Sequence, residues 1–176
     1  MNKETFCSYP FNSFFLGADG GVKFCCASRI NLGDINEQPI EDILHNEIST
    51  EIRTAILNGE WHTNCGLCYE LETQMSGNSD RLPSVRDYYD TLKDKIHPDY
   101  FEPAVVDMRW SNTCNLSCNY CYEYFSSRWA QLKGLKVNTN KSAAEQQVFD
   151  FLSKYKNVIE KVNLLGGEPL LQKQNN

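Results

Sequence analysis

Three cysteines stand close together in the stretch SNTCNLSCNYCYEYF, residues 111–125. Thiolates spaced C-x3-C-x2-C on a loop can converge on an iron–sulfur cluster, because iron in such clusters prefers sulfur ligands. A four-iron cluster held by only three thiolates leaves one iron free to bind a small molecule. The spacing therefore predicts that Cys114, Cys118 and Cys121 ligate a [4Fe-4S] cluster. A zinc knuckle and a ferredoxin-like site completed by a distant cysteine are the alternatives.

A second motif, Gly166-Gly167-Glu168-Pro169, ends the segment VNLLGGEP, residues 162–169. Taken alone, such a sequence most often marks a turn. Here it follows a predicted strand, and glycines at that end of a strand let a ligand approach the backbone closely. In parallel α/β structures ligands bind at the carboxyl ends of the strands. Its position therefore indicates a binding loop.

Four further cysteines could form a closed site in the first hundred residues. Cys7 and Cys25 bracket a predicted hairpin, and Cys65 and Cys68 form a tight C-x2-C knuckle. Structural zinc and iron–sulfur clusters share all-cysteine ligand sets, so both remain open for this site. Cys26, next to Cys25, leaves the identity of one ligand open as well.

The elements that must position these cysteines can be read from turn and capping signals. The sequence predicts a hairpin around residues 19–21, where A-D-G-G separates two β-prone runs. It also predicts helices within residues 39–46 and 49–60, the second capped by Ser49 or Thr50 and stopped by Gly59. A further helix is expected within residues 84–103, where Pro98 and Pro103 mark a boundary.

The second half of the chain has the pattern of a parallel α/β unit. A short strand at AVVDMRW, residues 104–110, precedes the cysteine loop, and a helix is predicted at about residues 143–156. A second strand lies within IEKVNLLGGEP, residues 159–169. Strand, loop, helix and strand form the building block of parallel sheets and barrels.

Composition narrows the function classes. The chain has 176 residues, is 41% hydrophobic and 23% charged, and carries a net charge of −6, as a soluble globular protein does. No basic stripe is present, so a nucleic-acid partner is not expected. No apolar run could span a bilayer and no leader precedes the first element, so we expect no membrane partner and a cytoplasmic protein. In that reducing compartment eight cysteines favour metal or cluster ligation over disulfides.

The motifs of the second half resemble the radical S-adenosylmethionine superfamily, whose signature is C-x3-C-x-aromatic-C after the first strand of a partial (β/α)6 barrel. The matching positions are Cys114, Cys118, Tyr120 and Cys121, followed by the G-G-E-P-like motif Gly166, Gly167, Glu168 and Pro169. The resemblance implies that S-adenosylmethionine chelates the free iron through its amino and carboxylate groups. The tyrosine would lie against this cofactor, and the glycine motif would contact its amino group.

The first half is similar to the twitch or SPASM auxiliary-cluster modules of the same superfamily. The resemblance implies a small α+β cysteine-rich domain at residues 1–100, holding a possible auxiliary iron–sulfur cluster through Cys7, Cys25, Cys65 and Cys68. It favours Cys25 over Cys26 because Cys25 keeps the family's G-x4-C spacing. In better-known members the module follows the core, whereas in twitch-containing radical S-adenosylmethionine proteins it comes first. Residues 101–176 would then be the N-terminal, truncated part of a core that normally has six βα units.

The function implied by this resemblance is that of an enzyme. It would cleave S-adenosylmethionine reductively to methionine and a 5′-deoxyadenosyl radical, which abstracts hydrogen from a substrate, often a peptide in related families. Its partners would be a one-electron donor such as flavodoxin or ferredoxin and a possible peptide substrate. The alternatives are a non-catalytic zinc-binding module and an inactive fragment.

Overall fold

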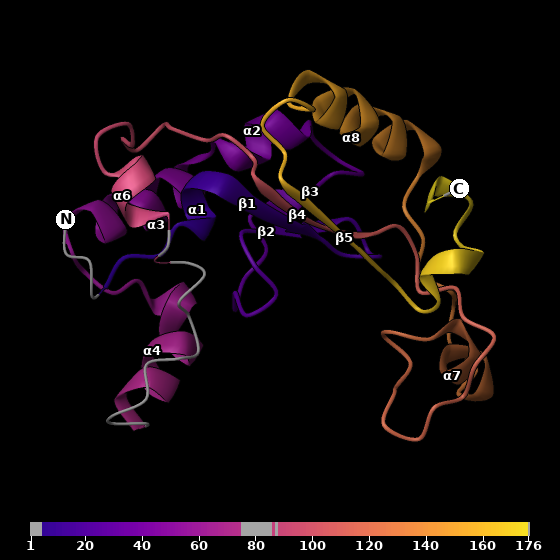
Figure 1. Cartoon of the computed structure of the whole chain (residues 1–176). Helices are drawn as coiled ribbons and strands as arrows, with labels where there is room; N and C mark the ends of the chain where they lie inside the picture. The colour runs from indigo at the N-terminus through magenta and orange to yellow at the C-terminus, as the bar shows by residue number, and fades with distance from the viewer. Residues whose placement is uncertain (1–4, 75–85, 87, 176) are drawn as a thin grey trace.

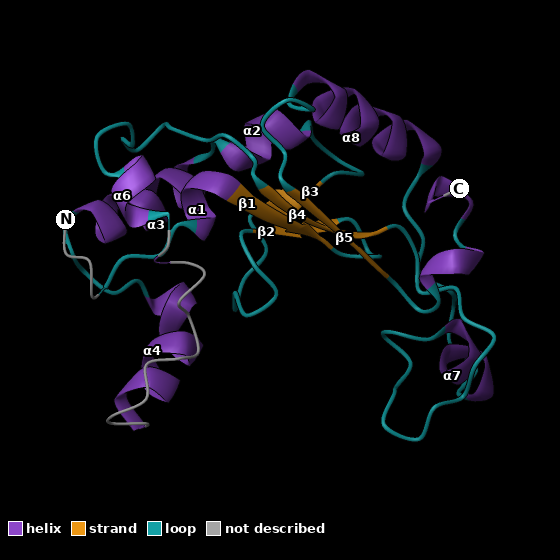
Figure 2. Ribbon diagram, viewed as in Figure 1, coloured by secondary structure: helices purple, strands orange, loops and turns teal. Residues whose placement is uncertain are grey.

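A mixed five-stranded sheet is the centre of the protein, and the computed structural model describes residues 5–74, 86 and 88–175. The strands are β1 (Ser13–Leu16), β2 (Gly21–Lys23), β3 (Gly33–Asp34), β4 (Val105–Arg109) and β5 (Lys161–Leu165). Their order in the sheet is β3-β2-β1-β4-β5. Figure 2 shows the sheet with helices around it. The fold is therefore α/β, as predicted, whereas a barrel remains a prediction.

The predicted hairpin forms the antiparallel half of the sheet. Leu16 of β1 pairs with Val22 of β2, and β2 pairs in turn with β3. Gly20 in the turn has φ of +90°, a conformation that favours glycine, and the Asp19 carboxylate accepts a hydrogen bond from the Gly21 amide at 3.2 Å. The hairpin prediction is confirmed.

The parallel half contains the predicted strand–helix–strand unit. β4 is followed by α7 (Ser127–Leu132) and α8 (Ser142–Lys154), and β5 returns parallel to β4 with Val106 opposite Val162. β4 also pairs with β1 in parallel, so one sheet includes strands from both halves of the chain. The cysteine loop follows β4, and the glycine motif follows β5. Both motifs therefore lie beyond the carboxyl ends of adjacent parallel strands.

One face of the sheet is covered by α2 (Ile40–Leu44) and α8, as Figure 2 shows. Alternation along β4 buries Val106 and Met108, and Phe14 of β1 meets Phe151 of α8 edge-on at 5.8 Å. Val162 and Leu164 of β5 lie opposite Val106 and Met108 but stay 45% and 46% exposed. The core is therefore centred under β1 and β4, and it thins toward β5.

The helices of the first half pack around a buried arginine. α3 (Glu47–Leu57) buries Arg53 completely, and its guanidinium donates to the carbonyl oxygens of Pro10 at 2.7 Å, Leu44 at 2.6 Å and Pro98 at 3.3 Å. The guanidinium also lies over the ring of Phe24 at 5.1 Å. Arg53 therefore links α1 (Tyr9–Asn12), α2 and the segment before β4 through hydrogen bonds to their backbones.

Most predicted helix positions are confirmed, and one cap is wrong. The side chain of Asn46, rather than Ser49 or Thr50, caps α3 by accepting from the Ser49 amide at 2.9 Å. Asn46 also donates to the Leu32 carbonyl at 2.8 Å, a tertiary bond that fixes it at this position. Gly59, with φ of +78°, follows the helix as predicted.

The helix expected within residues 84–103 lies partly outside the described residues. Its described part is the short helix α6 (Tyr89–Leu92). The remaining short helices are η1 (Thr63–Cys65), α4 (Gly66–Gln74), η2 (Pro169–Leu171) and η3 (Lys173–Asn175). Over the described ranges, none of the helices combines the length and apolar character needed to cross a bilayer.

Candidate iron–sulfur sites

The three cysteines of the second half lie on the loop between β4 and α7. All three thiols are free and half-buried, and the amide of Cys121 donates to the carbonyl of Cys118 at 3.0 Å. The amide of Leu116 donates to the sulfur of Cys114 at 3.4 Å. A backbone amide aimed at sulfur stabilises negative charge on a thiolate ligand and tunes the potential of an iron–sulfur cluster.

The start of this loop is anchored by two buried polar residues. Ser127 Oγ accepts from the Cys114 amide at 2.9 Å and donates to the Cys114 carbonyl at 3.2 Å. The fully buried Asn112 donates through its side chain to the Glu123 carbonyl at 3.1 Å, and its own carbonyl accepts from the Ser127 amide at 2.6 Å. Both backbone polar groups of Cys114, its amide and its carbonyl, are therefore hydrogen-bonded to Ser127.

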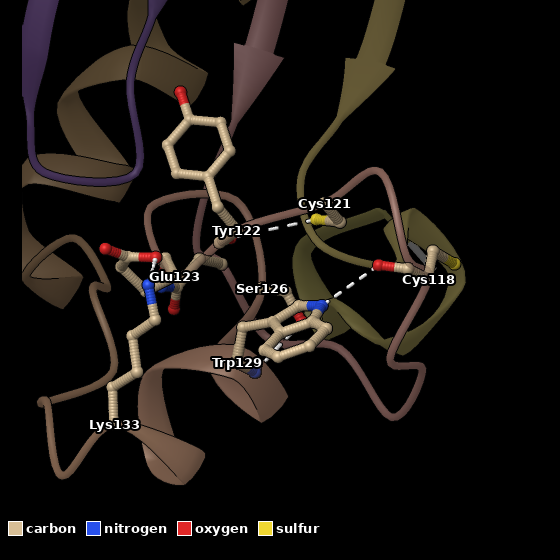
Figure 3. A network of polar contacts seen from close by, with 8 residues as sticks. Cys118, Cys121, Tyr122, Glu123, Ser126, Trp129 and Lys133 are labelled. Atoms are coloured by element: carbon tan, nitrogen blue, oxygen red, sulfur yellow. Dashed lines mark hydrogen bonds and ion pairs between the residues drawn. The ribbon is translucent and has the colours of Figure 1, made fainter.

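The far end of the loop is held by α7, as the close view in Figure 3 shows. Trp129 Nε1 donates to the Cys118 carbonyl at 3.0 Å, and Ser126 caps the helix by accepting from the Trp129 amide. The sulfur atoms of Cys118 and Cys121 point in different directions in this view. The structure thus brings the backbone of the predicted ligands together, and the convergence of their sulfur atoms remains a prediction.

The glycine motif packs directly against the cysteine loop. The Glu168 amide donates to the Thr113 carbonyl at 2.8 Å. A Cβ on Gly167 would lie 2.5 Å from the carbonyl oxygens of Asn112 and Thr113 and 2.6 Å from Cβ of Cys114. Only glycine permits such an approach. Two motifs separated by more than forty residues therefore form one surface.

Gln172 connects the two motifs through its side chain. Its side chain accepts from the Ser111 amide at 3.0 Å and donates to the Leu165 carbonyl at 3.1 Å, so it bridges the ends of β4 and β5. Gly166 has φ of +150°, and a Cβ there would lie 1.8 Å from Gln172 Nε2. The tight turn and the glutamine therefore depend on each other.

One exposed tyrosine and one partly buried arginine lie near the cysteine loop in the sequence. Tyr120 is 87% exposed, and its hydrogen bond to Cys118 raises the pKa of its phenol. Arg109, the last residue of β4, stacks over Phe125 at 4.3 Å, and burial lowers its pKa. Its Nε and Nη1 are buried without a hydrogen-bond partner, while Asp19 and Asp107 lie near enough to affect it electrostatically.

The N-terminal cysteines come from three separate segments and interact with one another. Burial raises the pKa of Cys7 well above its ordinary value, and the nearby Cys25, Cys65 and Cys68 raise it further. Burial likewise raises the pKa of Cys25 to about 12 and that of Cys65 to about 11. Cys26 is exposed. The structure thus gathers the four predicted thiols in one region and leaves Cys26 at the surface.

The donor sets of both regions fit thiolate-bound iron. Four thiolates gathered in a partly buried place are costly unless a cation compensates their charge, and metal binding releases the protons that otherwise neutralise them. Each ligand of a four-iron cluster binds a different iron, so its thiolates lie farther apart than those around one ion. Within residues 5–74, 86 and 88–175, no three His, Cys, Asp or Glu side chains are arranged to hold a single metal ion.

Comparisons with known proteins point to the same chemistry. A family model of an iron–sulfur cluster-binding domain, SPASM, matches residues 7–69, and one of a 4Fe-4S single cluster domain matches residues 103–176. Both halves of the chain are similar to iron–sulfur cluster-binding domains. The matches confirm the iron–sulfur part of the predicted cofactors and support a SPASM-type protein, whereas S-adenosylmethionine remains a prediction. Neither the curated proteins nor the solved structures gave a match.

Several residues that hold the site were not predicted from the sequence. Asn112, Ser127, Trp129 and Gln172 hold the cysteine loop and the glycine turn, yet none belongs to a spaced motif. No helix was predicted at residues 127–132, although Ser126, the cap of α7, is a residue type that often starts a helix and could have located it. The others act through tertiary contacts, which leave no local signal.

Proposed function

We propose that the chain is a radical S-adenosylmethionine enzyme of the SPASM type that acts in the cytoplasm, where its eight free thiols stay reduced. When bound and reduced, a four-iron cluster supplies the electron that splits S-adenosylmethionine into methionine and a 5′-deoxyadenosyl radical for hydrogen abstraction. The observation that carries this proposal is the contact of the glycine turn with the cysteine loop through Gly167 and Glu168.

The residues of the second half have distinct roles in this proposal. Cys114, Cys118 and Cys121 would hold the cluster and leave one iron for the cofactor. The glycine turn, Gly166 to Pro169, would present backbone to the amino group of the cofactor, and Tyr120 would lie against it. Ser127 and Trp129 position the loop by binding its backbone. Positioning of this kind can supply a large part of the rate enhancement.

The first half would hold an auxiliary cluster through Cys7, Cys25, Cys65 and Cys68. The electrostatic effect of its partly buried thiols on one another and the match to an iron–sulfur cluster-binding domain support this assignment. Figure 1 places α4, next to Cys65, and α7, next to Cys121, at opposite ends of the molecule. The two clusters would therefore serve different steps. The partners would be a one-electron donor such as flavodoxin or ferredoxin and a peptide substrate.

Anaerobic reconstitution with iron and sulfide tests the proposal. We expect about eight irons per chain and a brown protein, since two four-iron clusters need that number. Adding S-adenosylmethionine to the reduced protein should change its electron paramagnetic resonance spectrum, and this change should vanish in Cys118→Ala. A spectrum that S-adenosylmethionine leaves unaltered would overturn cofactor binding by this chain. A colourless protein that retains zinc would favour a non-catalytic zinc module instead.

A further inference from the structure

A groove of about 690 Å³ lies along α3 and the segment that follows it, residues 58–63. We call it the Trp61 groove, because the indole of Trp61 forms part of its wall. A smaller hollow of about 320 Å³ on the side of α4 shares Trp61, His62 and Thr63 with it. In Figure 1 this region lies at the end of the molecule that carries α3 and α4, away from α7.

Trp61 is held in place although it contributes little to the core. Its ring stacks on Tyr69 with centroids 4.2 Å apart and planes inclined by 5°, and Tyr69 is buried. The Tyr69 hydroxyl donates to the Thr5 carbonyl at 3.4 Å. Nevertheless Trp61 stays 52% exposed. Aromatic rings of this kind are enriched at binding surfaces, because covering their apolar area with a ligand lowers the free energy.

The charge of the groove has one sign. Glu47, Glu51 and Glu60 line it, and no lysine or arginine is among the described residues of its lining. Glu51 is also 3.5 Å from Nε2 of His62, whose Nδ1 accepts from the Asn64 amide at 3.2 Å. Acidic residues by themselves would form an ordinary solvated surface. Here they surround a fixed indole, and that combination suits a cation that also has an apolar stem.

We propose that the Trp61 groove binds a lysine or arginine side chain of a peptide. The ammonium or guanidinium group would lie over the face of Trp61 that does not stack on Tyr69, and it would donate hydrogen bonds to the carboxylates of Glu51 and Glu60. The methylene stem would cover apolar surface of the indole. Cation–π attraction and charge-assisted hydrogen bonds are the interactions that distinguish such a side chain from a neutral one of equal length.

The position of the groove relates this binding to the proposed chemistry. Trp61 precedes Cys65 by four residues, and Tyr69 directly follows Cys68. A peptide held here would therefore lie beside the predicted auxiliary site. The inference deepens the proposed function by naming basic peptides as the substrate class, and it rests on that function only for the fate of the bound peptide.

Isothermal titration calorimetry on the full chain tests the binding directly. The probes are N-acetylated, C-amidated pentapeptides of glycine with lysine, norleucine or glutamate at the centre. We expect the lysine peptide to bind about tenfold more tightly than the norleucine peptide, a ratio within the range of cation–π and ion-pair contributions. Raising the salt concentration should weaken binding of the lysine peptide, because part of its attraction is exposed electrostatics.

Matched variants distinguish the effect of the groove on peptide affinity from the effect of the net charge of the chain. Trp61→Leu should weaken the lysine peptide by about tenfold, and the double change Glu51→Gln with Glu60→Gln by at least about threefold. Glu37→Gln removes an exposed carboxylate outside the groove and should leave the affinity unchanged. Circular dichroism of each variant confirms that the chain is folded, and the carboxylate pair tests the proposal even if Trp61→Leu unfolds.

Equal binding of the lysine and norleucine peptides would overturn the proposal, as would full affinity in both groove variants. Titrations before and after cluster reconstitution keep the two proposals separate. Peptide binding without any effect of S-adenosylmethionine on the reduced protein would contradict the proposed function and leave the groove assignment intact. A spectral response to S-adenosylmethionine without peptide binding would contradict the groove assignment and leave the proposed function intact.

Discussion

The two cysteine sites of this chain are built in opposite ways. Cys114, Cys118 and Cys121 lie on one loop, which is held by hydrogen bonds to its backbone from Ser127 and Trp129. The N-terminal thiols come from three segments and meet only because a hydrophobic core brings those segments together. Burial raises the pKa of Cys7 strongly. A local loop can thus present its ligands for chemistry, whereas a site assembled from several segments depends on the stability of the fold around it.

This contrast has a consequence for the coupling of the two sites. The cysteine loop contacts the glycine turn through Gly167, so its organisation depends on β4 and β5. The N-terminal thiols depend instead on the packing around Arg53 and α3. Loss of a ligand at one site should therefore leave the cluster of the other site largely intact, and the following predictions test that independence.

The largest expected effect is on iron content after single cysteine changes. Cys118→Ala should lower the content of reconstituted protein from about eight to about four irons per chain, and Cys65→Ala should do the same at the other site. Iron analysis measures the loss, and the paramagnetic spectrum shows which cluster remains. Cys26→Ala, at an exposed thiol, serves as the control and should retain both clusters. Loss of all iron in either ligand variant would show that the two sites are not independent.

The next effect is on the stability of the first half. Arg53→Met should lower the free energy of unfolding by about 3 kcal/mol, because it leaves buried carbonyl acceptors without their charged donor. Urea unfolding followed by circular dichroism measures this change. The control is Arg29→Met, since Arg29 is half exposed and pairs with the equally exposed Glu70 at 2.7 Å, a pair that contributes less than about 1 kcal/mol. Equal losses in the two variants would contradict the role assigned to Arg53.

A smaller effect is expected where the two motifs of the second half meet. Gly167→Ala forces a methyl group against the backbone of the cysteine loop and should destabilise the protein by about 1–3 kcal/mol. It should also weaken the response of the reduced protein to S-adenosylmethionine while iron at the N-terminal site is retained. Gly134→Asn is the control, because no atom lies within 4 Å of its Cβ position and asparagine tolerates its φ of +69°. An unchanged response in Gly167→Ala would separate the glycine turn from cofactor binding.

The smallest effect concerns pH. Partial burial of the imidazole and the nearby Arg53 lower the pKa of His45, so the unfolded chain binds a proton at a pH where the folded chain does not. Stability therefore falls as the pH drops from about 6.5 through the lower folded value, and it is recovered as the pH rises. The other charged groups that act on this imidazole are Asp99, Glu41 and Lys154. His45 is exposed, so the change is small.

The pH dependence is checked by urea midpoints of the wild-type protein and His45→Asn between pH 5 and about pH 7.5, on either side of the ordinary histidine pKa. The variant should lose less stability on acidification than the wild type. A parallel dependence in the two proteins would assign the acid sensitivity to other groups. Iron at the cysteine loop should be unaffected by this change, which again tests the separation of the two regions.

Much of the second half could be predicted from sequence because its signals are local. The strands at β4 and β5, the helix α8 and the order of the motifs follow from hydrophobic pattern and glycine positions. Residues such as Gln172 and Asn112 could not be found in this way, since their partners lie 61 and 11 residues away and no spacing rule connects them. The cap of α3 failed for the same reason, because a bond from Asn46 to Leu32 decided it.

The types and spacing of the cysteines and glycines indicate a chemistry without reference to the fold, because both signals lie within short stretches of sequence. Which of these residues meet follows from the tertiary structure. The parallel pairing of β4 with β5 places Gly167 against Cys114, and its pairing with β1 joins the two halves in one sheet. Stacking on Tyr69 likewise leaves Trp61 half exposed beside acidic residues. Side-chain identity is a local property, whereas proximity depends on the free energy of packing the whole chain.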